Sequence, residues 1–153
     1  MVLLTKRFVF LSLLICYMVF IWMQSSYFNP EAMSSTLSTH INMKLILILG
    51  VSLELAHLFQ FGVVYLLVIM FFLSFGELSK WMDAVALMFA FMYGLIDEIH
   101  QLYVPYRSAS LLDLIKNCIG IFGAWWFTRK FYFSGQNNRI GRMLRWVTQS
   151  TKT

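Results

Sequence analysis

Asp97-Glu98-Ile99-His100-Gln101 opens the stretch that decides the fold of this chain, and the stretch continues through Arg107 and Asp113 to Gly120. Apolar runs lie on both sides of it and extend into its second half. Eight polar or ionisable side chains nevertheless fall within 21 residues, at positions 97, 98, 100, 101, 107, 113, 116 and 117. Groups of this kind are costly inside a membrane and by default mark a functional site.

The composition is that of a membrane protein with one domain. Of 153 residues, 59% are hydrophobic and only 12% are charged, whereas soluble domains have about 25% charged residues. The core is therefore expected to consist of helix–helix contacts in lipid. Cys16 and Cys118 lie in apolar runs and are expected to act as small hydrophobic residues, since no disulfide or metal spacing is present.

Four apolar runs predict transmembrane helices, because about 20 residues cross a hydrocarbon core of about 30 Å. No small-residue cleavage site follows the first run, which is therefore expected to stay uncleaved. A shorter segment, residues 39–53, predicts an interfacial or half-inserted helix between the first two spans. The fold class is thus all-α, with a transmembrane domain over residues 1–130 and a basic cytoplasmic tail over 131–153. The four predicted spans are Leu3–Gln24, Leu55–Phe75, Trp81–Ile96 with a helical continuation to Gln101, and Ala109–Phe127.

The distribution of lysine and arginine predicts the orientation. Nine of these residues fall on the side of the two termini and two on the other, with Lys116 inside the fourth span. Both termini are therefore expected in the cytoplasm. The polar residues at the start of the second span, Glu54, His57 and Gln60, then lie at the same outward-facing level as the 97–117 stretch.

Helical spacing places the polar residues of the third and fourth spans on one face each. Asp97, Glu98 and Gln101 share a face by their i,i+3 and i,i+4 relations. Asp113, Lys116, Asn117 and Gly120 form a stripe that must face the bundle, because charge facing lipid is costly. Small residues near this stripe allow close helix approach, and Arg107 is expected to pair with Glu98 or Asp113. The small residues are Gly120, Gly123 and Ala124.

The 97–120 stretch resembles the signature of the VanZ-like integral membrane proteins. The matching pattern is D-E-x-x-Q followed by R-x5-D-x3-N-x2-G. His57 with Phe61-Gly62, and the pair Ser25-Ser26, are weaker matches, and the resemblance covers roughly residues 8 to 127. The family is named for resistance to teicoplanin, a glycopeptide that binds cell-wall precursors. The resemblance implies a role at the bacterial envelope, near lipid head groups or lipid-linked precursors.

Three functions are compatible with these residues. The first is an envelope protein that binds or modifies an anionic head group or lipid-linked precursor through Arg107 and Lys116. Glu98 and Asp113 are its candidate acid/base residues if it is an enzyme. The second is a small oligomeric proton-coupled transporter or flippase, and the third is a non-catalytic assembly partner. The other candidate substrate-binding residues are His57, Asp97, Gln101 and Asn117.

Other interpretations of the same residues remain open. The charged stripe could be a structural network that ties helices together, although a buried ion pair is often no more stabilising than apolar packing. His57 and His100 with Asp97 or Glu98 could bind a divalent metal, although no paired-histidine motif supports it. Ser108 or Ser110 with His100 could act as a nucleophile. We expect no cofactor, no metal and no nucleic-acid partner, and a homo-oligomer is possible.

Overall fold

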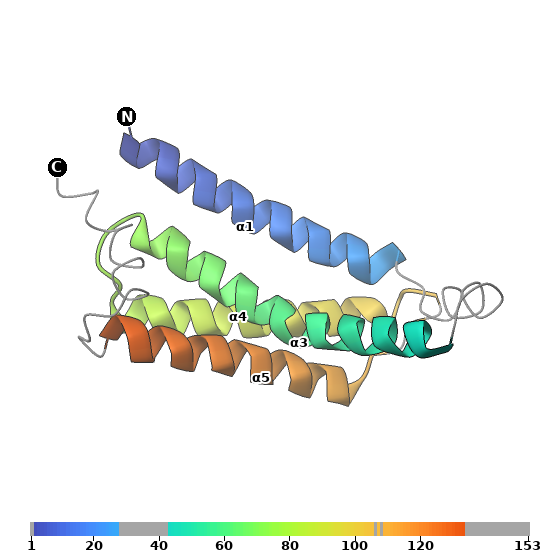
Figure 1. Cartoon of the computed structure of the whole chain (residues 1–153). Helices are drawn as coiled ribbons and strands as arrows, with labels where there is room; N and C mark the ends of the chain where they lie inside the picture. Colours follow the sequence, from blue (N-terminus) through green and yellow to red (C-terminus); the bar gives the residue numbers. More distant parts are fainter. Residues whose placement is uncertain (1, 28–42, 106, 108, 134–153) are drawn as a thin grey trace.

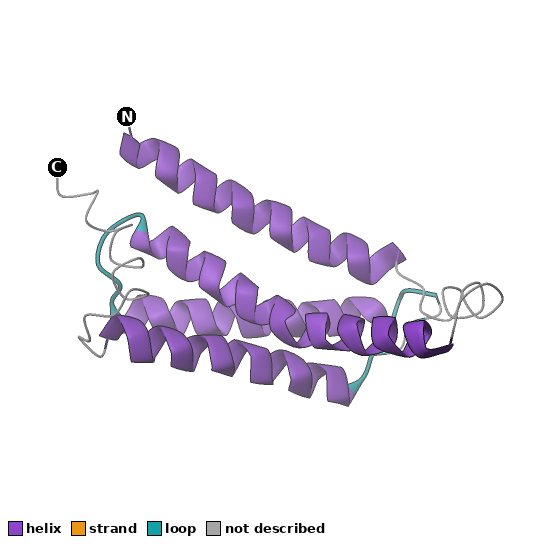
Figure 2. Ribbon diagram, in the orientation of Figure 1, coloured by secondary structure: helices purple, strands orange, loops and turns teal. Residues whose placement is uncertain are grey.

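The computed structural model describes residues 2–27, 43–105, 107 and 109–133, and these residues form four α-helices and no strand. The helices are α1 (Val2–Tyr27), α3 (Met43–Leu73), α4 (Lys80–Gln101) and α5 (Leu111–Thr128), and α5 continues into a π-helical turn, η1 (Arg129–Phe133). Successive helices run in opposite directions along the bundle (Figure 1). The C-terminal end of α4 and the N-terminal ends of α3 and α5 consequently lie at the same end (Figure 2). The predicted all-helical class is confirmed for this part of the chain.

Helix α3 is the centre of the bundle and contacts the other three helices. Its second half contributes the largest share of the buried apolar side chains, among them Phe61, Val64, Tyr65, Val68, Ile69 and Leu73. A helix that is apolar on all sides is expected to be buried in this way. The prediction of a separate interfacial helix ending at Leu53 is wrong for residues 43–53, because α3 continues through this position without interruption. Residues 39–42 lie outside the described residues.

The first helix combines length with apolar character. Leu4–Tyr27 is long and apolar enough to cross a membrane, and Leu58–Leu73 is a shorter apolar segment of α3. Helix α1 packs on α3 and α4 and buries only a narrow stripe that includes Leu14, Ile21 and Ser25. Most of its remaining surface is exposed and apolar.

Helix α4 has the reverse of the polarity expected for a helix in water. Its buried residues are small or polar: Asp83, Ala86, Ala90, Tyr93, Gly94, Asp97, Glu98 and Gln101. Its exposed residues include Met88, Phe89, Phe91, Met92, Ile96 and Ile99. Soluble proteins bury apolar residues and leave most ionisable ones exposed, whereas membrane helices turn small and polar residues toward their neighbours.

Two glycines set the distance between α3 and α5. A Cβ atom added at Gly62 would lie 2.7 Å from the Gly120 carbonyl oxygen, and one added at Gly120 would overlap the carbonyl group of Leu58. The helix backbones are therefore in direct contact, as small residues permit in membrane bundles. The same role predicted for Gly123 is wrong, since an added Cβ there meets no described atom within 4 Å.

Candidate functional site

The polar side chains gather at the end of the bundle where α4 ends and α5 begins. We call this region the polar end and define it by residues 97–101, Arg107, residues 110–117, Gln60 of α3 and the facing residues 22–26 of α1. On the α3 side, Phe61 packs on Gly94 and the next residue, Gly62, packs on Gly120, so these two glycines lie at similar depth. Asp97 and Asn117 each lie three residues, or about 4.5 Å, beyond them toward the same end. The two side chains are therefore at one level.

Glu98 connects the end of α4 to the start of α5. Glu98 is buried, with only 4% of the residue exposed. One carboxylate oxygen accepts a hydrogen bond from Asn117 Nδ2 at 3.3 Å, and the other accepts from the backbone N–H of Ser110 at 3.3 Å. Ser110 is the N-cap residue of α5, where the helix dipole also favours a negative charge. These two contacts tie the end of α4 to the start of α5.

Asp97 and Gln101 form a buried pair next to Glu98. Both residues are 1% exposed, and Gln101 Nε2 donates to Asp97 Oδ2 at 2.9 Å. Their position on α4 follows from the i,i+4 spacing, which the sequence pattern also predicts. Burial of all three residues agrees with the single inward face expected for Asp97, Glu98 and Gln101.

Helix α1 is joined to this end through its own polar residues. Ser26 Oγ lies 2.9 Å from His100 Nε2, and the His100 ring stacks on Trp22 with a centroid distance of 3.8 Å. Gln60 Nε2 on α3 donates to Gln24 Oε1 at 3.1 Å. Gln60 therefore faces α1, while Gly62 faces α5. The contact between Ser26 and His100 was not expected from the sequence, because the two residues are far apart along the chain.

Asp113 and Lys116 pair with one another on the first turns of α5. Lys116 Nζ lies 2.9 Å from Asp113 Oδ1, and each side chain is about one-third exposed, at 30% and 31%. The expected pairing of Arg107 with Glu98 or Asp113 is absent: within the described part of the chain the Arg107 guanidinium takes part in no ion pair. The physical reason is that Asp113 has a cation one turn away on its own helix, and Glu98 is occupied by Asn117 and Ser110.

Several buried acceptors at this end lack a donor among the described residues. They are Asn117 Oδ1, Gln60 Oε1 and Ser25 Oγ, in residues that are 1%, 6% and 4% exposed. Buried polar atoms in proteins nearly always have a partner, whether protein, water or ligand. The polar end is thus rich in acceptors that can receive further hydrogen bonds.

Two predictions cannot be compared with side-chain geometry. His57 lies within α3, but its side chain is outside the described part, and Ser108 is outside it altogether. The described residues bring no three of His, Cys, Asp and Glu together in an arrangement that could hold a metal. A site that includes the His57 side chain, and the expected absence of a metal, therefore stay predictions.

A second buried carboxylate lies at the opposite end of the bundle and was missed in the sequence. Asp83 is fully buried. One of its oxygens accepts from Tyr65 Oη at 2.5 Å, and the other accepts from Trp125 Nε1 at 3.1 Å and from Arg129 Nε at 3.0 Å. We call these four residues the Asp83 centre. It joins α3, α4, α5 and η1 through one carboxylate.

The family model for VanZ/LLP1 matches residues 8–132, which is most of the chain. The match begins in α1 and ends in η1, so that it contains both the polar end and the Asp83 centre. No protein of curated function and no solved structure matches the chain. A helical bundle with buried ionisable side chains, apolar outer faces and this family match defines a membrane protein. The chain belongs to the VanZ/LLP1 family.

Proposed function

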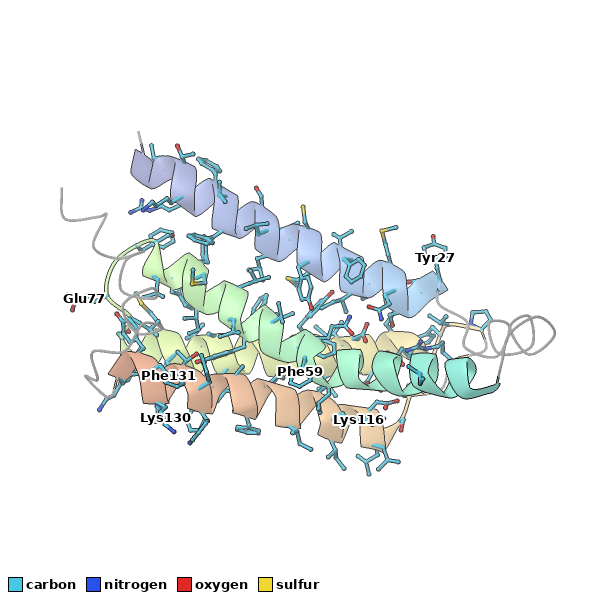
Figure 3. All side chains as sticks on the ribbon, in the orientation of Figure 1. Tyr27, Phe59, Glu77, Lys116, Lys130 and Phe131 are labelled. Carbon is cyan, nitrogen blue, oxygen red and sulfur yellow. The ribbon has the colours of Figure 1, made fainter. Side chains whose placement is uncertain are left out.

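We propose that the chain crosses the membrane four times, with both termini in the cytoplasm and the polar end facing outward. The apolar exposed faces of α1, α4 and α5 support this arrangement. Arg129 and Lys130 lie over the rings of Trp125 and Trp126 at 4.7 Å, at the end that the charge distribution assigns to the cytoplasm. Figure 3 labels Lys116, near the start of α5, and Lys130, which lies in η1 at the opposite end of the bundle.

We propose further that the polar end binds the phosphate-bearing head group of a lipid or of a lipid-linked cell-wall precursor. The observation that carries this proposal is the half-buried Arg107 side chain, whose guanidinium has no ion pair among the described residues. Its loop is held close by Glu98, since Arg107 is three residues, at most about 11 Å, from Ser110. A guanidinium recognises phosphate by two parallel hydrogen bonds. Lys116, in the second turn of α5, is a second cation at this end and also pairs with Asp113.

Binding agrees with the geometry better than acid/base catalysis does. Asp113 is paired with Lys116, and each carboxylate oxygen of Glu98 accepts a hydrogen bond, one from Asn117 and one from the backbone of Ser110. Both carboxylates are therefore engaged with neighbouring groups of the protein, whereas an acid/base residue has to lie within hydrogen-bond reach of the substrate proton that it transfers. We therefore propose that Glu98 positions the start of α5. The residues proposed to contact the ligand are Arg107, Lys116, Asn117 and the Asp97–Gln101 pair.

The transporter alternative has less support. Between the polar end and the Asp83 centre, the buried side chains of the described bundle are apolar apart from the Tyr93 hydroxyl, which donates to the Met18 carbonyl oxygen; the apolar ones include Phe61, Val64, Ala86, Ala90 and Ile121. A polar route through one bundle would have to cross this layer. A site that receives a head group at one end requires no such route. The third function, a non-catalytic assembly partner, is also tested by the experiment that follows.

The experiment compares lipid and precursor binding between two matched variants. Full-length protein with Arg107→Gln should retain less phosphate-bearing lipid in native mass spectrometry than the unchanged protein, whereas Lys130→Gln at the opposite end should not differ from it. In cells, the pools of lipids and cell-wall precursors with and without the protein identify the ligand. A new chemical species would indicate an enzyme, and changed sidedness a flippase. Equal lipid retention by the two variants would contradict the proposed binding of the head group by Arg107. The role as an assembly partner would then be favoured.

A further inference from the structure

The proposed binding of a head group leaves one close contact at the polar end unused. Ser26 Oγ lies 2.9 Å from His100 Nε2, between the last turns of α1 and α4. A serine hydroxyl and a histidine nitrogen within about 2.6–3.2 Å of one another are the first two parts of an activated nucleophile. The sequence pattern allows Ser108 or Ser110 as the partner of His100, whereas the structure brings the hydroxyl of Ser26 to its ring.

The Ser26 hydroxyl can give its proton to the histidine without any movement of the backbone. Its O–H points to the Trp22 carbonyl oxygen at 2.8 Å, and His100 Nε2 lies at nearly the same distance, 2.9 Å. Rotation about the Cβ–Oγ bond turns the O–H from the first acceptor to the second, since a hydroxyl hydrogen takes the position that suits its partners. Nε2 is then the acceptor, and Nδ1 carries the ring proton.

An aromatic side chain fixes the orientation of the base. The His100 ring stacks on Trp22 with a centroid distance of 3.8 Å and an interplanar angle of 22°. Trp22 therefore orients the imidazole, as a third group does in catalytic triads. Ser26 and His100 are both only half-buried, so that a reactant can reach the pair.

The surroundings of the pair indicate the class of substrate. Trp22 and Tyr27, on the same turns of α1 as Ser26, are exposed, and exposed tryptophan and tyrosine mark the boundary between membrane and water. The ester bonds that join acyl chains to the polar part of a lipid lie at this boundary. We propose that Ser26 is a nucleophile, and His100 its general base, toward an acyl ester of a membrane lipid.

The reaction is an acyl transfer in two steps. Ser26 Oγ first attacks the ester carbonyl carbon while its proton passes to His100 Nε2. The bond from this carbon to the alcohol oxygen of the lipid then breaks, and Nε2 returns the proton to that oxygen. In the second step water, or the hydroxyl of another lipid, gives its proton to Nε2 and attacks the acyl carbon. Oγ leaves with that proton, so that the serine and the histidine are restored.

The first test is covalent labelling of the full-length protein in detergent with an alkyl fluorophosphonate, from which an activated serine displaces fluoride. Peptide mapping should find the label at Ser26. His100→Gln can still hold the hydroxyl but does not accept its proton, and it should slow labelling about 100-fold at unchanged helix content. Ser12→Ala, at an exposed serine of the same helix, should leave the rate unchanged. Absence of label at Ser26, or an unchanged rate in His100→Gln, would overturn the inference.

The second test concerns the substrate. In micelles with total bacterial lipid whose acyl chains carry an isotope label, the protein should release labelled fatty acid or transfer the chain to another lipid. Ser26→Ala should lose this activity. Cleavage of a short-chain soluble ester alone, or equal activity in Ser26→Ala, would contradict the assignment. Arg107→Gln should leave the labelling rate of Ser26 unchanged, because the inference goes beyond the proposed head-group binding and does not depend on it.

Discussion

Replacing Gly120 with alanine should separate α3 from α5. An added Cβ would lie 3.0 Å from the Leu58 carbonyl carbon and would overlap its oxygen. Ordinary contacts of a Cβ atom begin at about 3.4 Å, and both obstructing atoms belong to a helix backbone, which cannot rotate away as a side chain can. The helices must therefore move apart along their contact. Overpacking of this kind typically costs 1–3 kcal/mol and occasionally more, and we expect about 3 kcal/mol here.

The assay is thermal unfolding of the purified protein in detergent, with helix content as the readout. For a chain of this size, 1 kcal/mol corresponds to about 2–4 °C in Tm, so that Gly120→Ala should lower Tm by about 6–12 °C. Gly62→Ala meets the Gly120 carbonyl oxygen at 2.7 Å and should cost less. Gly123→Ala is the matched control on the same helix, since an added Cβ there meets open space, and it should leave Tm unchanged or raise it by up to about 4 °C, because alanine favours the helix by up to about 1 kcal/mol. A Tm for Gly120→Ala equal to that of Gly123→Ala would refute the close crossing.

Three further predictions follow from the other contacts. Tyr65→Phe removes a donor from the buried Asp83 carboxylate and should cost about 1–3 kcal/mol in the same assay; Tyr103→Phe, at a residue 81% exposed, should be neutral. Cysteines placed at residues 77 and 103, in a chain without its native cysteines, should react with impermeant reagent from the cytoplasm and from outside respectively. The opposite result would reverse the proposed orientation. Truncation after Phe133 should leave Tm unchanged, because it retains the described helices, and a large decrease would show that the tail belongs to the bundle.

The helical class and the inward faces of the helices could be predicted from the sequence, because in a membrane the polarity of a side chain determines whether it faces lipid or the other helices. Polar residues at helical spacing inside an apolar run must turn toward the bundle, and this places Asp97, Glu98 and Gln101 correctly. The end of α4 at Gln101 was likewise expected, since Pro105 disfavours helix in the residue before it. Close packing at Gly120 follows from the same reasoning about small residues.

The continuous course of α3 and the partners of the charged residues could not be predicted. The apolar segment at residues 39–53 predicted a separate helix because Gly50 and Ser52 interrupt it, but glycine is common in membrane helices, and α3 runs through both positions. The pairing of Arg107 was wrong because distance along a loop says little about side-chain contacts. A cation one helical turn away competes better, and Lys116 has that position relative to Asp113.

Asp83 was missed for a different reason. It lies in the first turn of α4, three residues after Lys80, where an acid is ordinary because it complements the helix dipole. Its partners are separated from it by 18, 42 and 46 residues. If the predicted helices are aligned as an antiparallel bundle, Asp83 lies at the same end of the bundle as Tyr65, Trp125 and Arg129. Each of these residues alone is typical of a membrane interface.

The two ends of the bundle differ in how completely their buried polar groups are hydrogen-bonded. This difference predicts which substitutions change stability and which change lipid binding. At the Asp83 centre, three donors from three elements meet one carboxylate, one of them a cation. Each oxygen of this buried carboxylate therefore has a donor from the protein itself, and removal of a donor should change stability alone. At the polar end, buried acceptors remain open and Arg107 has no ion pair among the described residues. Such an end is costly to maintain without a ligand or water. Substitutions at the polar end should therefore change lipid retention more than Tm, and substitutions at the Asp83 centre should do the reverse.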